Sequence, residues 1–269
     1  MNKWTKRIAL SILAVTSVFQ LTTVSAETVV KVGTEGAYPP YNFINEEGEV
    51  DGYDIAVVKA VDELLEDVSF EFAPTAWDGI FVALDAGEFQ FISSNLTKND
   101  EREAKYLFAD EAYNYEGVQL IFKAGRDDIK SLEDLKGKKV AAGVGNANTT
   151  FLEQYNEANN NEIEIVYTDG NINNALLELE NDQVDATIGS VITTQLTADE
   201  LGIEIDSILL EELEIKPVYF LFSQSEENEV LKEQIDEALR QLKEEGVLTE
   251  LSIQYFGRDQ SSEEAAKAN

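Results

Sequence analysis

The sequence lacks histidine and cysteine, and this limits the chemistry that the chain could perform. The absence of both excludes Ser-His and Cys-His catalysis, thiol chemistry and disulfides, and it removes the imidazole and thiolate ligands of transition metals. Acid–base chemistry would depend on carboxylate, lysine or tyrosine side chains alone. We assign no catalytic residue in the interpretation favoured below, and we predict no metal site and no cofactor.

One arginine in a polar segment is a candidate for binding a ligand. Arg102 follows the stretch 93–99, which is rich in Ser, Asn and Thr. A planar guanidinium beside hydroxyl and backbone N–H donors fits the two oxygens of a carboxylate. The alternative is a surface arginine that pairs with one of the 53 acidic residues, and this composition makes that alternative a strong one.

Aromatic residues and one glycine-containing turn could complete such a site. Tyr38, Tyr41 and Trp77 fall at predicted strand ends, where they could enclose the apolar part of a ligand or pack in the core. The turn at 143–145 (Gly-Val-Gly) resembles part of a dinucleotide-binding motif but lacks the third glycine at the required spacing. It still offers backbone N–H donors at the start of a helix.

Alternating strands and helices must position these residues. Apolar residues alternate along 28–33 and recur at helical spacing along 55–65, and a similar series follows Gly125. This β-α-β order predicts an α/β fold with mostly parallel sheets. Ligands bind such sheets beyond the carboxyl ends of the strands, which selects four loops: 34–40, 93–102, 143–148 and 189–191.

Two extended connectors, 117–123 and 217–222, bracket the second series and are rich in β-branched and aromatic residues. The simplest arrangement is discontinuous. Residues 27–116 with 223–269 would form lobe 1, and residues 124–216 would form lobe 2. The connectors would then be hinge strands beside a cleft.

The two ends of the chain are predicted to lie outside the folded body. Residues 1–26 begin with basic residues, continue with an apolar run and end in Val-Ser-Ala, the order of an export signal that is cleaved after Ala26. The apolar run is well short of the roughly 20 residues that span a bilayer, although an uncleaved anchor is the alternative. Without a cysteine for lipid attachment, we expect a periplasmic or extracellular protein. The polar tail 259–269 is expected to be frayed.

The formal net charge of −33 argues against partners that are themselves polyanions. Nucleic acids and anionic membranes bind proteins whose Lys and Arg neutralise phosphates, so we expect neither as a partner. One interpretation of the acidity is adaptation to high salt, and the other is an ordinary acidic exported protein. The apolar content of 43% excludes wholesale disorder.

Several stretches, taken together and in order, carry a resemblance to a known family. They are 32–43 (VGTEGAYPPYNF), 48–54 (GEVDGYD), 75–79 (TAWDG), 100–102 (DER) with 106–109 (YLFA), 128–140 (DIKSLEDLKGKKV) and 184–186 (VDA). The whole mature chain resembles the family-3 extracytoplasmic solute-binding proteins of polar amino-acid ABC transporters, with the cystine-binding subgroup nearest. The resemblance implies an α/β clamshell of the type 2 periplasmic-binding-protein class, with two lobes and two hinge crossings.

The resemblance also implies roles for individual residues. Arg102 would hold the α-carboxylate of the ligand with help from Thr97, while Tyr38 and Trp77 would flank the ligand's side chain. The other residues implied to line the pocket are Glu35, Ser94 and Asn95 from lobe 1, with Gly145, Asn146, Asn148 and Ser190 from lobe 2.

Three positions depart from the family's usual pattern. Asn99 replaces a threonine, and the pair at 146–147 (Asn-Ala) replaces a hydroxyl residue. Ser190 stands where an aspartate usually receives the ammonium of the ligand, and a neutral hydroxyl cannot compensate a buried ammonium. Either Glu35 or another acid such as Asp169 takes that role, or the ligand is not an ordinary α-amino acid.

Three functions remain open from the sequence. The first is binding of cystine or a related polar amino acid by a monomer that delivers it to an ABC permease. The second is a dehydratase-like enzyme on the same fold, in which Glu35 would be the acid and would need a strongly shifted pKa. The third is a sensory protein that presents its ligand to a separate receptor.

Overall fold

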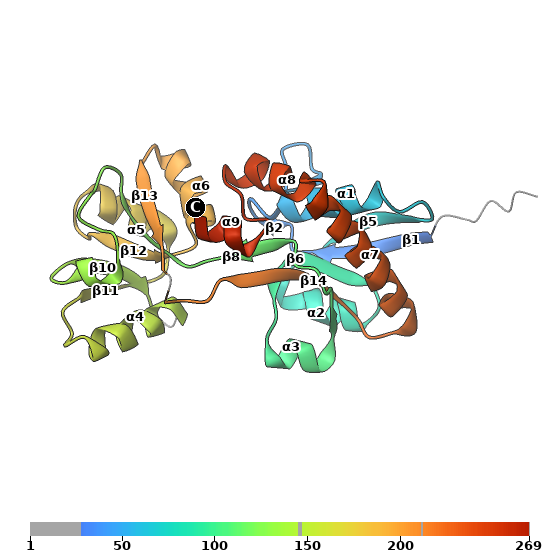
Figure 1. The fold of residues 1–269 in the computed structure, drawn as a ribbon, viewed down its shortest axis with the longest axis horizontal. Coiled ribbons are helices and arrows are strands. Elements are labelled where there is room, and N and C mark those ends of the chain that lie inside the picture. Colours follow the sequence, from blue (N-terminus) through green and yellow to red (C-terminus); the bar gives the residue numbers. More distant parts are fainter. Residues whose placement is uncertain (1–27, 145–146, 211, 269) are drawn as a thin grey trace, which may run out of the picture.

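The computed structural model describes residues 28–144, 147–210 and 212–268, so the expected export signal lies outside the described residues. Two larger sheets, each with its own helices, lie side by side along the longest axis of the molecule (Figure 1). We call them lobe 1 and lobe 2. No helix within the described ranges combines the length and the apolar character that a membrane span requires.

The sheet of lobe 1 has the strand order β5-β1-β6-β14-β7, and β8 also pairs with β14. The strands β5, β1 and β6 are parallel, whereas β14 runs antiparallel to its neighbours. The bounds are β1 (Thr28–Thr34), β5 (Val68–Pro74), β6 (Phe91–Thr97), β7 (Leu107–Phe108), β8 (Asn114–Glu116) and β14 (Lys216–Phe222).

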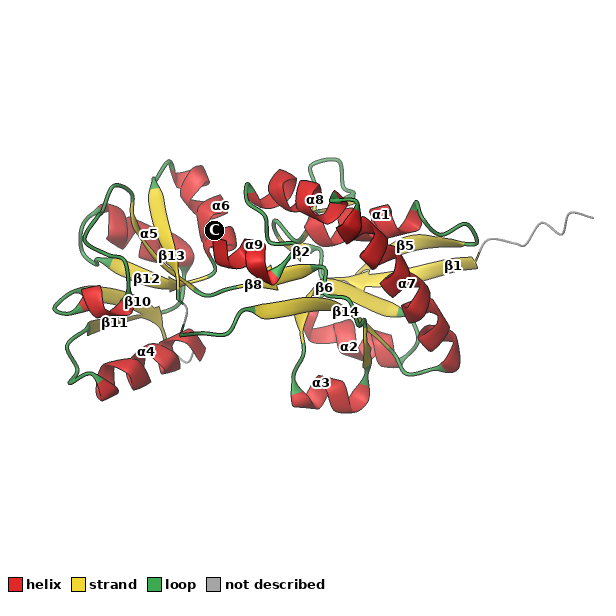
Figure 2. Ribbon diagram, in the orientation of Figure 1, coloured by secondary structure: helices red, strands yellow, loops and turns green. Residues whose placement is uncertain are grey.

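Helices cover both faces of this sheet (Figure 2). On one face, α1 (Tyr53–Asp62), α7 (Glu226–Glu244) and α8 (Val247–Phe256) share a core with the strands through residues such as Val58 and Ile235. On the other face, α2 (Trp77–Asp85) buries Ile80 and Leu84 against the sheet. Burial on both faces accounts for the unbroken apolar run 218–222 of the inner strand β14 (Lys216–Phe222).

The sheet of lobe 2 has the order β11-β10-β12-β9-β13, in which β9 is antiparallel to its neighbours. Leu152 of α4 and Leu176 of α5 belong to separate cores, so helices cover both faces of this sheet as well. The bounds are β9 (Gln119–Lys123), β10 (Lys139–Gly143), β11 (Glu164–Thr168), β12 (Ala186–Gly189), β13 (Ile205–Leu209), α4 (Ala147–Ala158), α5 (Ile172–Glu180), α6 (Val191–Leu201) and a 3₁₀ turn at Leu132–Leu135.

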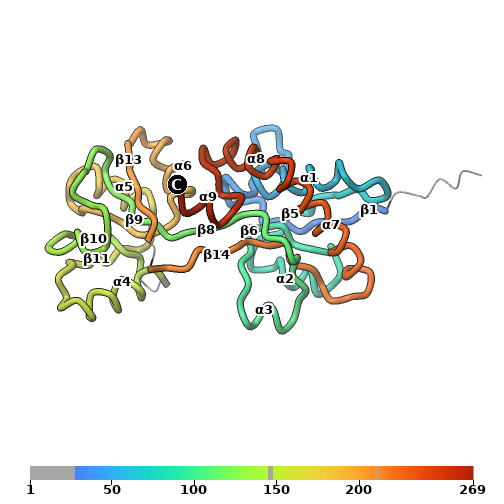
Figure 3. Tube along the Cα trace, in the orientation of Figure 1, coloured from blue at the N-terminus to red at the C-terminus, as the bar shows by residue number. Residues whose placement is uncertain are grey.

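The two connectors extend further into the sheets than the sequence suggested. The segment 119–123 is β9 of lobe 2, and 216–222 is β14 of lobe 1, so the chain crosses between the lobes just before each strand. The two crossings lie next to each other (Figure 3). A Cβ atom placed on Gly117, in the first crossing, would lie 3.5 Å from Cγ1 of Ile215 in the second crossing, and 2.3 Å from Cδ1 of Leu209 at the end of β13. A side chain at position 117 would therefore require the end of the Leu209 side chain to move.

Short elements account for the other differences. A small sheet of β2 (Ala37–Tyr38), β3 (Asn42–Ile44) and β4 (Val50–Asp51) was not expected. The expected loop 93–102 is instead the end of β6 followed by α3 (Asp100–Lys105). The side chain of Asn99 accepts a hydrogen bond from the backbone N–H of Arg102 and begins this helix, as N-cap asparagines do.

The expectation of a frayed tail is wrong for the described residues. Gln260 is buried, its N–H donates to Ser252 Oγ (2.7 Å), and its carbonyl accepts from the N–H of Tyr115 in β8 (2.9 Å). Beyond it, α9 (Glu263–Ala268) packs on β8 and buries Ala266. The composition of the tail is polar, but tertiary contacts hold it against the crossing.

Candidate functional site

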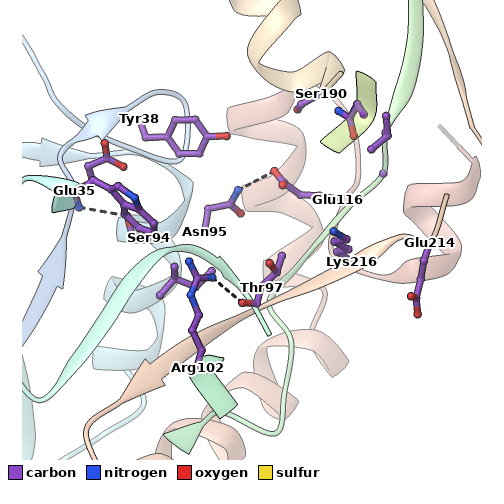
Figure 4. A pocket seen from close by; sticks show the side chains of 15 residues that line it. Glu35, Tyr38, Ser94, Asn95, Thr97, Arg102, Glu116, Ser190, Glu214 and Lys216 are labelled. Carbon is purple, nitrogen blue, oxygen red and sulfur yellow. Dashed lines mark hydrogen bonds between the residues drawn. The ribbon is translucent and has the colours of Figure 1, made fainter. Parts of the chain in front are cut away.

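A cavity of about 580 Å³ lies between the lobes, at the carboxyl ends of the strands (Figure 4). Within the described ranges, every residue that the sequence analysis assigned to the pocket lines it; Gly145 and Asn146 lie outside the described residues. The assigned residues that line it are Glu35, Tyr38, Trp77, Ser94, Asn95, Thr97 and Arg102 from lobe 1, and Asn148 and Ser190 from lobe 2. A molecule in this cavity would therefore touch both lobes.

Arg102 presents a guanidinium to the cavity from α3. Its Nη1 donates to the carbonyl of Thr97 (2.9 Å), and its Cζ lies 5.7 Å from the ring of Trp77 and 5.4 Å from that of Phe81. Burial lowers the pKa of Arg102 from its ordinary value. These contacts orient the group and leave most of its five N–H donors available.

Arg102 makes no ion pair with another described residue, although the protein is rich in carboxylates. By contrast, Arg126 lies 2.7 Å from Asp128, and Arg240 lies 3.3 Å from Glu111. The expected alternative, a surface arginine neutralised by a neighbouring acid, does not describe Arg102. A carboxylate from a ligand is the partner that this geometry suits.

A β-bulge directs two polar side chains of β6 to the cavity. Ile92 pairs with Leu221 and Leu96 with Tyr219, so three residues of β6, 93–95, lie opposite one residue of β14. Asn95 has φ of 46°, a conformation that asparagine tolerates better than most residues. Ser94 Oγ then accepts from the N–H of Glu35 (3.4 Å).

The sequence analysis missed the charged residues at the crossings. Glu116, Glu214 and Lys216 also line the cavity, and Glu116 and Lys216 are paired in register between β8 and β14. The signal that could have found them is the presence of charged residues directly beside the strongly apolar connectors. Such a charge is costly at a crossing between two cores unless it has a partner or a function.

Glu116 is held by two donors from lobe 1. The hydroxyl of Tyr41 and the amide of Asn95 (2.8 Å) both donate to Oε1 of Glu116. Burial raises the pKa of Glu116, while these two donors and the charge of Lys216 act in the opposite direction. Tyr41 itself is fully buried and stacks on Tyr38 with ring centroids 5.0 Å apart.

Tyr41 also connects the lobes. Burial raises the pKa of its hydroxyl well above the ordinary value, the charge of Glu116 raises it further, and a hydrogen bond with Ser190 acts in the opposite direction. Ser190 precedes α6, and its side chain does not cap that helix. Ser190 lines the cavity, and together with Tyr41 it also lines a small neighbouring cavity.

The lobe 2 side of the site continues into a second cavity of about 230 Å³, which shares Asn148 and Ser190 with the first. Threonine side chains from β11, β12 and α6 line this extension. Asp169, one of the two acids considered as a substitute at the ammonium site, lines neither of these cavities and belongs to a separate surface hollow beside Tyr167. Glu35, the other acid, lies in the first cavity.

Comparisons with known proteins agree with this architecture. The family model for bacterial extracellular solute-binding proteins, family 3, matches residues 30–258. The L-cystine-binding proteins TcyK and TcyJ of Bacillus subtilis (strain 168) are each 30% identical to this chain, over 87% and 88% of it and 86% of each relative.

A solved structure shows the same fold. The L-cystine solute receptor of Neisseria gonorrhoeae, in an unliganded open conformation, matches with a TM-score of 0.78 at 26% identity, over 89% of this chain and 97% of that one. Its match extends over both lobes and the crossings. The chain therefore belongs to the bacterial extracellular solute-binding proteins of family 3 and has their type 2 periplasmic-binding-protein fold.

Proposed function

We propose that this protein binds a polar α-amino acid, cystine or a related compound, in the cavity between its lobes and delivers it to an ABC importer. The observation that carries the proposal is the guanidinium of Arg102, which lines the cavity without an ion pair to another described residue. The relatives named as L-cystine-binding proteins support this ligand class. Binding and release require no catalytic step, and we propose none.

The mechanism follows from the position of the cavity. Arg102 and Thr97 bind the carboxylate from lobe 1, and Tyr38 and Trp77 contact the ligand's side chain. Asn148 and Ser190 add contacts from lobe 2, so the ligand favours the conformation in which both lobes reach it. The lobes would move about the two crossings, and the closed form would dock on the permease. In this proposal residues 1–26 direct export and are removed, and the mature protein is a monomer.

A ligand panel tests the proposal. The purified protein is heated with L-cystine, with each common L-amino acid, and with carboxylic acids that lack the amino group. A ligand at about 100 times its Kd adds roughly 2.7 kcal/mol to the free energy of unfolding, which gives a clear rise in Tm. We expect an α-amino acid to give this rise, and titration calorimetry then measures its Kd. If no α-amino acid raises the Tm, the proposal is wrong.

A further inference from the structure

An α-amino acid carries an ammonium as well as a carboxylate, and the site must compensate both charges. Removing an ammonium from water is costly unless an anion receives it. Three carboxylates line the cavity within the described part of the chain: Glu35, Glu116 and Glu214. Which of them faces the ammonium determines how the protein recognises its ligand.

Glu116 is the carboxylate that the protein holds most firmly. Both of its donors, Tyr41 and Asn95, bind the same oxygen, Oε1. No described residue donates to Oε2, so this oxygen can accept from a ligand. Asn95 is fixed in turn, because the amide of Asn114 donates to its Oδ1 (3.2 Å).

The other two acids are held less well. Glu214 is exposed, in the crossing that precedes β14. Glu35 takes part in the network through its backbone N–H, and no described residue donates to its carboxylate. A carboxylate with a fixed orientation loses less conformational entropy when it binds an ammonium than a mobile one does.

The location of Glu116 also fits the lobe 2 side of the site. The hydroxyl of Tyr41 donates to Glu116, and Tyr41, Glu116 and Ser190 together line one small cavity, so the acid and the serine lie near the same tyrosine. Figure 4 shows Glu116 beside Asn95, on the side of the cavity that Ser190 and Lys216 also approach. The negative charge at this position comes from the crossing strand β8, and lobe 2 contributes a neutral hydroxyl.

We infer that Glu116 receives the α-ammonium of the ligand, through its free Oε2, while Arg102 binds the carboxylate. This inference rests on the proposed function, because it assumes a zwitterionic ligand. It makes Glu116 the residue that distinguishes α-amino acids from carboxylic acids of the same shape. It also ties recognition of the amino group to a strand at the hinge.

The experiment compares binding of two ligands by the protein and its variants. The ligands are L-cystine and 3,3′-dithiodipropionate, which has the same skeleton without the amino groups; if another amino acid is the strongest binder in the panel, it and its deaminated acid are used. Glu116→Gln keeps the size and the carbonyl oxygen but removes the charge. We expect its preference for the amino acid over the deaminated acid to fall at least tenfold.

A rescue variant separates recognition from structure. In Glu116→Gln with Ser190→Asp, a carboxylate returns next to the Tyr41 hydroxyl from the lobe 2 side, and we expect the preference for the amino acid to recover. The matched control is Glu88→Gln, which removes the same charge from an exposed turn outside the cavity and should leave both Kd values unchanged. If Glu116→Gln folds poorly, Glu116→Asp is used instead. It keeps the negative charge, but its side chain is one methylene shorter and places the carboxylate further from the ligand. It should therefore also reduce the preference for the amino acid over the deaminated acid.

The outcomes distinguish this inference from the proposed function. If the unmodified protein binds no α-amino acid, the proposed function fails and the inference fails with it. If the unmodified protein binds one and Glu116→Gln retains the same preference, only the inference is overturned. The inference would also be overturned if Glu116→Gln lost affinity equally for both ligands and Ser190→Asp did not restore the preference for the amino acid. Such a result would give Glu116 a structural role at the hinge.

Discussion

Arg102 is the residue whose charge the protein leaves for a ligand. Hydrogen bonds to charged groups contribute about 1.5–3 kcal/mol each, so Arg102→Gln should weaken binding of the amino acid by roughly 10- to 150-fold. The Tm of the unliganded protein should change little, because among the described residues the guanidinium donates one hydrogen bond, to the carbonyl of Thr97. Calorimetry measures the Kd values. Arg240→Gln, outside the cavity on α7, is the control, and equal affinity in the two variants would contradict the assignment.

Asp54 should give the stability a distinct pH dependence. Burial raises its pKa to about 7, although Asn42 (2.8 Å) and Tyr113 (2.9 Å) donate to its oxygens. Between about pH 4 and 7 the folded state therefore holds a proton that the unfolded state has released, so the stabilising contribution is complete below about pH 4 and disappears as the pH rises to about 7. The free energy of unfolding of the unmodified protein, relative to that of Asp54→Asn, should fall by at most about 1.4 kcal/mol per pH unit in this window.

Urea unfolding at several pH values measures this difference for the two proteins in parallel. The comparison cancels the repulsion among the many other carboxylates, which both proteins share. Glu88→Gln, which removes a carboxyl from an exposed turn, is the control for the loss of a single acidic side chain. A constant difference between Asp54→Asn and the unmodified protein would show that the buried carboxyl stays ionised over this range.

The sequence could indicate Arg102 but not Glu116, and the reason is physical. An arginine is rare in this chain and follows a polar stretch, so its type and position are informative without the fold. Glu116 is one of 53 acidic residues, and its importance depends on contacts with Tyr41 and Asn95, which are 75 and 21 residues away along the chain. Those contacts exist only once the sheet of lobe 1 has formed.

At the scale of elements, long periodic segments were predictable and short ones were not. The strand 28–34 and the helix 226–244 bury apolar residues in an order that the sequence reveals, and the strand 68–74 partly buries Phe70 and Phe72 at alternate positions. The two-residue strands of the small sheet and the six-residue helix α3 have too few residues to show a period. Since α3 carries Arg102, the part of the fold that positions the site was the least predictable.

The C-terminal tail gives a prediction at this scale. A chain that ends at Arg258 loses the two backbone hydrogen bonds of Gln260 and the burial of Ala266 on β8. At about 0.5–1.5 kcal/mol for each hydrogen bond, we expect the free energy of unfolding to fall by roughly 1–3 kcal/mol. Urea unfolding checks this value. A chain that ends at Ala266 keeps both hydrogen bonds and should retain most of the stability; equal losses in the two truncations would contradict the role given to Gln260.

At the scale of the whole molecule, the dominant feature is the imbalance between 53 acidic and 20 basic residues. The ion pairs of the described residues leave most carboxylates without a cation, for example those of the exposed first turn of α7. Like charges on a compact body repel one another more than on an expanded chain, so this surface lowers the stability of the folded state at low ionic strength. Salt reduces the repulsion, because the screening length falls from about 10 Å at 0.1 M to about 3 Å at 1 M.

We therefore expect the free energy of unfolding to rise between 0.05 and 2 M NaCl. Urea is the denaturant of choice, since guanidinium is itself a salt. Most of a screening effect should appear below about 1 M, whereas stabilisation by exclusion of the salt from the surface grows steadily with concentration. Sucrose, which acts by exclusion without screening, is the control and should lack the steep initial rise. A flat response to NaCl would leave the acidity without a role in stability, and would favour an ordinary acidic exported protein over one adapted to high salt.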